Sequence, residues 1–386
     1  MRFSVDAHAI GRHLTGNEVY IRSLLRAFAS QDKRNTFIAY VSVGRAQAAA
    51  WIPSRFETRR IAANPFLRLG FDLPRKLWQD RPNLVHVQYT APLNCPVPVV
   101  VSVHDVSFLN HPEYFPPVRA WQLRQTVSRT VRAATRVLTG SEFSRDSIVR
   151  AYGLSKDRVV VVPNAAGPGF RPIRTEDAIG KVFSRWGISG PFILSVGDLQ
   201  PRKNHIGLIS AYEQLVRTHP RIRHHLVMVG KDTWFGGRVR ARAGESAFSD
   251  RIHFPGFVSD EDLLQFYNAC ELFVFPSFYE GFGLPILEAM ACGRAVTCSN
   301  TSAMPEVADG AAILFDPHSV DEMTATMAGL LLDGELRGHM ERLGRQRAAQ
   351  FTWQRTARKT LEVYYEVAGA STHARQATAV ASLSAR

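Results

Sequence analysis

The chain has little cysteine, no long apolar run and no leader-like start. Its 4 cysteines form no CxxC pair, and a chain of 386 residues can bury a sufficient core without disulfides, so we expect reduced thiols and a cytoplasmic location. No stretch approaches about 18 consecutive apolar residues, which excludes a transmembrane helix, and the N-terminus lacks the apolar core of a signal peptide. Hydrophobic residues make up 45% of the chain and charged residues 21%, which excludes a disordered chain or a fibre.

Acidic residues are scarce in the first half. Residues 1–180 carry 25 Lys and Arg against 13 Asp and Glu, a net charge of +12, whereas residues 181–386 carry 22 against 21, which leaves +1. The first half should therefore face something anionic, such as an acidic acceptor, a membrane surface or nucleic acid. We expect no nucleic acid, because no recognised binding motif accompanies the charge.

Two nucleotide-binding signatures are also missing. Neither G-x-G-x-x-G nor G-x-x-x-x-G-K-[ST] occurs, which disfavours a dinucleotide-binding enzyme and a P-loop ATPase. The chain instead contains short, β-branched apolar runs that alternate with helical periodicity, which is typical of parallel sheets buried on both faces. We expect strands at 2–7, 37–43, 84–88, 97–103, 136–139 and 159–162, and a second set at 192–196, 226–229, 252–254, 272–275, 295–298 and 312–315.

The two sets of strands predict an α/β protein with two doubly wound domains. A stretch rich in glycine, proline and charge, 167–188, separates them and gives domains over 1–172 and 188–354. We expect a last helix over about 355–367 and a disordered tail over 368–386. Ligands of open α/β sheets bind beyond the carboxyl ends of the strands, so the expected site is a cleft between the two domains.

A basic segment follows the first strand of the second set. Gly197 comes directly after this strand and lets the backbone approach a ligand closely. Arg202 and Lys203 come next, at the start of a predicted helix, where two cations and backbone N–H groups suit a phosphate or diphosphate. A solvated basic turn is the alternative, and it is the commoner explanation for an isolated Arg-Lys pair.

A second segment, Glu280-Gly-Phe-Gly-Leu-Pro-Ile-Leu-Glu288, follows a later strand. Gly281 and Gly283 expose the backbone, and Pro285 suits the first turn of a helix. We interpret the two carboxylates as acceptors for sugar hydroxyls at the two ends of a ligand, and not as a glycosidase pair. An ordinary carboxylate on a helix face also explains Glu288 taken alone. Together with the basic segment, this pattern suits a nucleotide-sugar.

These segments resemble those of the retaining glycosyltransferases of family 4, which have the GT-B fold: two Rossmann-like domains facing each other across a cleft. The most specific element is the Glu-seven residues-Glu signature, and the resemblance extends from about residue 5 to residue 367. It includes the shorter segments 15–18, 102–105, 202–204, 255–260 and 302–306. The glycine loop departs from the pattern, because many relatives have a further glycine and an Arg-Tyr pair after the position of Gly16.

The resemblance implies a retaining hexosyltransferase that uses a donor of the GDP-mannose or UDP-glucose type and an acceptor hydroxyl in glycan, glycolipid or polysaccharide synthesis. The implied catalytic residues are His104, Arg202, Lys203 and Glu280. The implied donor-binding residues are Gly16, Gly197, Val258, Phe282, Gly283, Leu284 and Glu288. By the same resemblance the last helix crosses back to the N-terminal domain. Two cations that neutralise the diphosphate make a metal ion unnecessary, so no metal and no other cofactor are expected.

Aromatic and basic residues interleave at 66–71 and 75–78, which suits an anionic membrane surface or a charged lipid-linked acceptor. A solvated helix face with ordinary core aromatics explains the same pattern. If the segment meets a membrane, we expect a cytoplasmic protein with peripheral contact to the inner face of the cytoplasmic membrane. Two other functions remain open: a nucleotide-sugar epimerase of the same fold, and a non-catalytic protein that binds anions or membranes.

Overall fold

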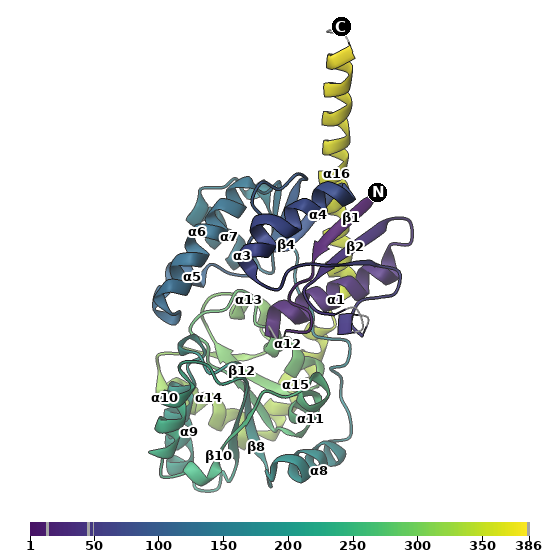
Figure 1. Cartoon of the computed structure of the whole chain (residues 1–386). Helices are drawn as coiled ribbons and strands as arrows, with labels where there is room; N and C mark the ends of the chain where they lie inside the picture. The colour runs from purple at the N-terminus through teal and green to yellow at the C-terminus, as the bar shows by residue number, and fades with distance from the viewer. Residues whose placement is uncertain (13–14, 45–46, 49, 384–386) are drawn as a thin grey trace. The chain divides into compact units, whose positions relative to one another are not determined.

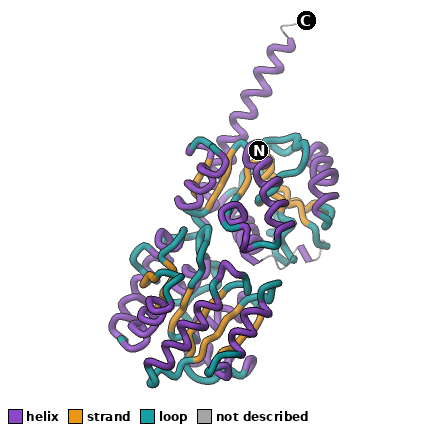
Figure 2. Tube along the Cα trace, turned by 90° about the vertical axis from the view of Figure 1, so that its left-hand side faces the viewer, coloured by secondary structure: helices purple, strands orange, loops and turns teal. Residues whose placement is uncertain are grey.

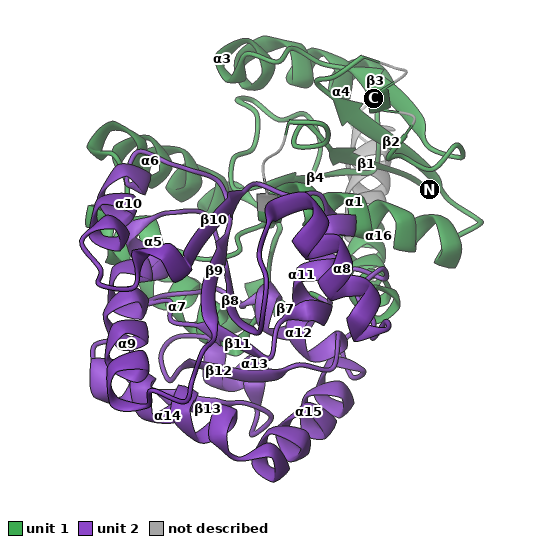
Figure 3. Cartoon of the chain, turned by 90° about the horizontal axis from the view of Figure 1, so that it is seen from below, with its two compact units in different colours: residues 1–164, 352–386 green, residues 165–351 purple. Residues whose placement is uncertain are grey.

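The computed structural model describes the chain except residues 13–14, 45–46, 49 and 384–386 (Figure 1). It divides into two compact units: unit 1 is Met1–Asn164 with Thr352–Arg386, and unit 2 is Ala165–Phe351 (Figure 3). In each unit the strands form one parallel sheet that helices cover (Figure 2). The predicted class, two parallel-sheet α/β domains, is confirmed.

Unit 1 contains a seven-stranded sheet in the order β3-β2-β1-β4-β5-β6-β7. Its strands are β1 (Arg2–Asp6), β2 (Thr36–Val41), β3 (Glu57–Arg60), β4 (Leu84–Gln88), β5 (Val99–Ser102), β6 (Arg136–Thr139) and β7 (Val159–Val161). The register pairs Phe3 with Leu84 and with Phe37. β3 was not predicted, because this edge strand reads Glu-Thr-Arg-Arg and has no apolar run.

Helices cover both faces of this sheet. Side chains alternate along β4, so that Val85 and Val87 join the core cluster under α4, α6 and α7, whereas His86 faces Tyr364 of α16. Phe28 of α1 also packs against Tyr364. The helices and turns are α1 (Thr15–Gln31), α3 (Pro65–Leu67), the π-turn η1 (Arg68–Asp72), α4 (Leu73–Asp80), α5 (Ser107–Asn110), η2 (Pro112–Tyr114), α6 (Pro117–Ala133), α7 (Glu142–Tyr152), η3 (Lys156–Arg158) and α16 (Trp353–Leu383).

The C-terminal helix differs from the prediction. α16 is one helix of 31 residues that ends at Leu383, so a helix occupies most of the segment 368–386 for which we expected a disordered tail. This segment is rich in alanine, the residue with the highest helix propensity, and it contains no proline. Its low hydrophobicity suggested disorder, but alanine forms a helix without needing a buried face.

Unit 2 contains a six-stranded sheet in the order β10-β9-β8-β11-β12-β13. Its strands are β8 (Phe192–Val196), β9 (His225–Val229), β10 (Ile252–Gly256), β11 (Leu272–Phe275), β12 (Ala295–Ser299) and β13 (Ile313–Phe315). Phe273 and Phe275 point into one core cluster, whereas Leu272 and Val274 point into another. Both faces of β11 are therefore buried, as expected of a central parallel strand.

The helices and turns of unit 2 are α8 (Thr175–Trp186), η4 (Pro201–Lys203), α9 (His205–Thr218), α10 (Gly236–Gly244), η5 (Ser249–Arg251), α11 (Asp260–Ala269), α12 (Leu284–Ala291), α13 (Met304–Ala308), α14 (Val320–Leu332) and α15 (Gly334–Ala348). α8 lies within 167–188, the stretch that we expected to separate the two domains. Ala178 and Val182 of α8 are fully buried in the core of unit 2, so this unit starts before residue 188.

Candidate functional site

Three loops of unit 2 meet beyond the carboxyl ends of β8, β11 and β12. The N–H of Phe278 donates to the carbonyl oxygen of Arg202 at 2.9 Å, and Arg202 Nη1 donates to the carbonyl oxygen of Tyr279 at 2.8 Å. The N–H of Glu280 donates to Ser302 Oγ at 2.9 Å. These bonds join the predicted basic segment, the first carboxylate and the loop after β12 into one rigid site.

Glu280, Arg202 and Lys203 form a buried ion cluster. Glu280 Oε2 lies 2.6 Å from Arg202 Nη1, Glu280 Oε1 lies 2.7 Å from Lys203 Nζ, and no side chain of the three is more than 17% exposed. Burial alone would raise the pKa of the Glu280 carboxyl, but the charges of Arg202 and Lys203 outweigh burial and lower it to about 2. The cluster therefore keeps one net positive charge in a partly desolvated place.

Two glycines make room for this cluster. A Cβ on Gly197 would lie 3.0 Å from Cδ and Cε of Lys203, so the lysine side chain folds back over a bare backbone. A Cβ on Gly230 would lie only 2.0 Å from the carbonyl oxygen of Gly197, which excludes any side chain at position 230. Gly197 was predicted but Gly230 was not, because Gly230 is required by a contact with the end of a neighbouring strand, which the sequence does not show.

The helix starts around the cluster differ from the prediction. Arg202 and Lys203 lie in the short 3-10 turn η4, and α9 begins only after Asn204, which has a φ of +52°. Asn204 Oδ1 accepts the N–H of Gly207 at 3.2 Å, so a side chain already satisfies part of the α9 N-terminus. α12, in contrast, begins after Gly283 at φ +97° without a side-chain cap among the described residues. The N–H groups of Gly283 and Leu284 thus suit an anion better than the start of α9.

Glu288 lies on α12 and has a different partner from Glu280. The hydroxyl of Tyr267 donates to Glu288 Oε2 at 2.9 Å, and both side chains are buried. Burial raises the pKa of Glu288 to about 7, and the negative charge of Asp260 acts in the same direction. The two carboxylates of the signature therefore differ in charge state near neutral pH. Tyr267 was not predicted, because no motif links it to a residue 21 positions away.

Val258 borders a cavity of about 490 Å³ in unit 2. The cavity lies between α8 and the start of α11, and its lining residues are Lys181, Ser184, Arg185, Trp186, Phe257, Val258, Ser259, Glu261, Asp262 and Gln265. Val258 itself packs against the core, and Ser259 caps α11 by accepting the N–H of Asp262 at 3.1 Å. Its lining is partly apolar and partly polar, which is what a nucleobase requires.

In unit 1, Gln88 links His104 to the first turn of α1; Gly16, which we expected in a glycine loop, lies in this turn. Gln88 Nε2 donates to the carbonyl oxygen of Asn17 at 3.2 Å, so its Oε1 faces His104 Nε2 at 3.1 Å. Burial lowers the pKa of His104 to about 4, although the charge of Asp105 opposes the shift. The imidazole of His104 is therefore neutral, with its proton on Nε2. Gly16 is exposed, and a Cβ there would meet nothing within 4 Å.

A buried polar network supports His104. His86 Nε2 lies 2.7 Å from Ser102 Oγ, and the hydroxyl of Tyr20 lies 2.8 Å from the same oxygen. His86 Nδ1 lies 2.6 Å from the hydroxyl of Tyr364 on α16. The ring of Tyr20 contacts that of His104 edge to face, with centroids 4.7 Å apart. His86 and Gln88 were not predicted, because in the sequence they look like ordinary residues of a buried strand.

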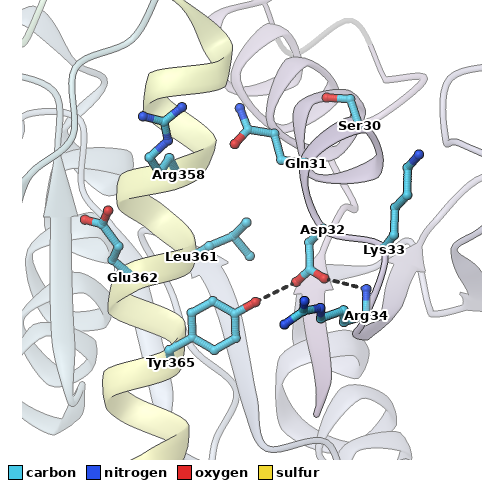
Figure 4. A pocket seen from close by; sticks show the side chains of 9 residues that line it. All are labelled: Ser30, Gln31, Asp32, Lys33, Arg34, Arg358, Leu361, Glu362 and Tyr365. Carbon is cyan, nitrogen blue, oxygen red and sulfur yellow. Dashed lines mark hydrogen bonds between the residues drawn. The ribbon is translucent and has the colours of Figure 1, made fainter.

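A second cavity, of about 380 Å³, lies in unit 1 between the end of α1 and α16 (Figure 4). Its central carboxylate, Asp32, already accepts the hydroxyl of Tyr365 at 3.0 Å and the N–H of Arg34 at 2.9 Å. This cavity is therefore a junction that holds α16 to unit 1, and we assign it no ligand.

Within the described part of the chain, no three His, Cys, Asp or Glu side chains are grouped so that they would hold a metal ion. Among the same residues, no helix is both long enough and apolar enough to span a membrane.

The fold and this constellation of side chains define a glycosyltransferase of the GT-B type, and comparisons with known proteins agree. The family models "Glycosyltransferase Family 4" and "Glycosyl transferases group 1" match residues 14–167 and 183–347. The O-antigen chain mannosyltransferase B of Escherichia coli is 35% identical over 266 residues, which cover 69% of each chain. The chain belongs to glycosyltransferase family 4.

Other relatives are longer or more distant. The serotype-specific mannosyltransferase WbdA of Escherichia coli is 31% identical over 275 residues, which are 70% of this chain but only 33% of WbdA. Sucrose-phosphate synthase from Thermosynechococcus elongatus has the same fold, with a TM-score of 0.76 at 18% identity over 96% of this chain and 100% of that chain. Anabaena HepE, solved in complex with UDP and glucose, gives a TM-score of 0.75 at 17% identity over 95% and 100%.

Proposed function

We propose that this chain is a retaining, metal-independent hexosyltransferase that moves mannose from GDP-mannose to a hydroxyl of a growing glycan or lipid-linked acceptor. The observation that carries the proposal is the buried cluster of Arg202, Lys203 and Glu280. Its net positive charge suits a diphosphate, and its carboxylate suits sugar hydroxyls. Mannose is preferred to the glucose of UDP-glucose because several relatives are named mannosyltransferases.

In this proposal, each candidate site residue of unit 2 contacts one part of the donor. Arg202, Lys203 and the free N–H groups at the start of α12 stabilise the charge that develops on the diphosphate as it departs, which is typically the largest electrostatic contribution to catalysis. Glu280 and the backbone of Phe282 hold the hexose hydroxyls. The remaining two contacts are Glu288 to the ribose and Val258 to the base.

Retention requires that the new bond forms on the face that the diphosphate leaves. The bond between the anomeric carbon and the phosphate oxygen breaks, the bond to the acceptor oxygen forms, and the acceptor proton passes to the departing phosphate oxygen. The protein then needs no nucleophile of its own. His104 is neutral at pH 7 because burial lowers its pKa to about 4, and Gln88 Oε1 accepts its Nε2 proton, so the imidazole adds no charge at this place.

The decisive experiment incubates the enzyme with GDP-mannose or UDP-glucose and a range of soluble glycan acceptors, and determines the anomeric configuration of the product by NMR. We expect mannosyl transfer with retention. An inverted product would contradict the proposed mechanism. Isomerised donor without transfer would identify the epimerase alternative, and nucleotide binding without any turnover would identify the non-catalytic one.

We expect transfer to continue in excess EDTA. Arg202 and Lys203 supply the positive charge that a divalent ion would otherwise bring to the diphosphate. The measurement compares initial rates with and without chelator, and with added Mg²⁺ or Mn²⁺. Loss of transfer that a divalent ion restores would refute the metal-independent proposal.

Glu288→Gln should raise KM for the donor by roughly tenfold and leave kcat within about twofold. A ribose contact is made equally in the ground state and the transition state, so its loss affects binding only. Because the ionised carboxylate is the better acceptor and its pKa is about 7, KM of the unmodified enzyme should fall as the pH rises from 6 to 8.

The Gln variant provides the control for this pH dependence, because its side chain cannot ionise. Its KM should be flat over the same range. If KM of both enzymes follows the same pH curve, a group other than Glu288 titrates.

We also propose a cytoplasmic location with peripheral contact to an anionic membrane. Unit 1 holds 28 Lys and Arg against 13 Asp and Glu, a net charge of +15, while unit 2 holds 19 against 21, a net charge of −2. A donor that carries negative charge binds to the nearly neutral unit. The excess of unit 1 is therefore available to another anionic partner.

A further inference from the structure

One continuous helical segment of unit 1 is apolar on its outer side. α3, η1 and α4 follow each other without interruption from Pro65 to Asp80. Four large apolar side chains on this segment are exposed to solvent: Phe66 by 78%, Leu67 by 62%, Phe71 by 66% and Trp78 by 64%. We call these four residues the apolar surface. The alternative that they are ordinary core aromatics is wrong.

Helical spacing places most of the apolar surface on one stripe. Leu67, Phe71 and Arg75 are each four residues apart, and Trp78 follows three residues later, so these side chains are neighbours along one side. Two other leucines of α4 are fully buried on the opposite side and anchor the helix in the core. A helix that is apolar on both sides is expected where its outer side meets a partner.

Exposed cations accompany the apolar surface. Arg75 is exposed, and the guanidinium of exposed Arg81 lies 5.8 Å from the centroid of the Trp78 ring. The other two cations of the segment are less exposed, and each lies near a carboxylate. Arg68 is only 6% exposed and lies 3.9 Å from the carboxylate of Asp6, and Lys76 Nζ lies 3.8 Å from the carboxylate of Asp72.

α6 carries the same chemistry. It covers the same face of the sheet as α4, because both helices contribute to one core cluster (Figure 1). Val118 and Trp121 on α6 are 69% and 63% exposed, and Arg119 and Arg124 beside them are exposed too. The sequence of α6 contains four arginines and no acidic residue.

We propose that this face of unit 1, with α3, η1, α4 and α6, docks on an anionic lipid bilayer. Aromatic and aliphatic side chains that enter the interface, with arginines beside them, are the chemistry that an anionic membrane binds. A second copy of the chain fits poorly, because this face of a unit with a net charge of +15 would meet its own charge. The inference deepens the proposed membrane contact by naming the residues that make it.

The test is co-sedimentation of the full chain with vesicles of phosphatidylcholine, with and without phosphatidylglycerol, at low and at physiological salt. We expect binding only to the vesicles with phosphatidylglycerol, with a steep loss toward physiological salt, where the screening length is about 8 Å. Replacing Leu67, Phe71 and Trp78 together by glutamine should weaken binding by at least roughly tenfold. The matched control replaces three exposed apolar residues of unit 2 by glutamine, namely Ile179, Phe183 and Trp234, and should bind as before.

Charge is tested separately on the same helix. Arg75→Gln with Arg81→Gln should weaken binding by about thirtyfold, since each cation near an anionic surface contributes roughly a factor of five. Lys76→Gln is the matched control, because this lysine is already paired with Asp72, and it should leave binding within about twofold. Unchanged binding by the arginine variant, or equal binding to neutral vesicles, would overturn the proposal.

Failure of this inference is distinguishable from failure of the proposed function. All these variants should transfer sugar to a soluble acceptor at the rate of the unmodified enzyme, since none alters the donor cluster. Absent vesicle binding with normal transfer overturns the docking surface alone. If the unmodified chain is a dimer in solution and the Leu67, Phe71 and Trp78 variant is a monomer, the partner is a second copy instead.

Discussion

Lys203→Ala and Arg202→Ala should each lower kcat by a factor on the order of 10²–10³, the typical cost of removing one preorganised charged contact to a transition state. Both side chains are held before any donor binds: Arg202 by the Tyr279 carbonyl and Glu280, Lys203 by Glu280 and by the bare backbone of Gly197. Their charges therefore need no reorganisation when the diphosphate departs.

The measurement is kcat at saturating donor for both variants and for Arg217→Ala. Arg217 is exposed in the last turn of α9, so this control removes the same charge from unit 2 without touching the cluster. We expect the control to stay within about twofold. The thermal unfolding temperature of each variant shows whether the loss of one cation beside Glu280 destabilises the protein. Values of kcat within about threefold of the unmodified enzyme for both cluster variants, less than about 1 kcal/mol of barrier, would refute the assigned role.

The strands were predictable because a strand that is buried on both faces appears in the sequence as a short, nearly continuous apolar run. β8, β11 and the central strands of unit 1 are short apolar runs, and every expected strand has an observed counterpart. β3 and the last part of α16 were not predictable in this way. β3 is a polar edge strand, and the end of α16 forms a helix from alanine propensity without an apolar stripe.

The site was predictable only where its residues are neighbours in sequence. Arg202 with Lys203, and Glu280 with Glu288, stand in short motifs whose spacing carries chemical meaning. Their partners come from elsewhere in the chain, such as Tyr267 for Glu288, and nothing local distinguishes such residues from core side chains. The charge state of Glu288 followed only from its burial, which a sequence does not show.

The other large effect is expected on replacing Glu280, because this carboxylate and the bound diphosphate interact with the same two cations. The carboxylate binds both cations in the free enzyme, and its pKa of about 2 keeps it ionised at any working pH. A bound diphosphate must share Arg202 and Lys203 with it. Glu280→Gln keeps the shape and the acceptor oxygen but removes a full negative charge from the place where the diphosphate arrives.

Glu280→Gln should therefore bind the nucleoside diphosphate more tightly, by roughly tenfold or about 1.4 kcal/mol, while kcat falls by roughly a hundredfold. Binding improves because a repulsive charge is gone. Turnover falls because a neutral amide positions the hexose and stabilises positive charge at the anomeric carbon less well than a carboxylate does. Isothermal titration with the nucleoside diphosphate and steady-state kinetics with the donor measure the two effects separately.

This pattern is the reverse of the one expected for Glu288→Gln, in which binding weakens and kcat persists. The two variants therefore control each other, because each removes one ionisable carboxylate from the same signature. If Glu280→Gln raises KM and spares kcat, while Glu288→Gln abolishes turnover, the roles of the two carboxylates are exchanged. If Glu280→Gln weakens diphosphate binding as well as turnover, the carboxylate positions Arg202 and Lys203 for the diphosphate and does not compete with it for them.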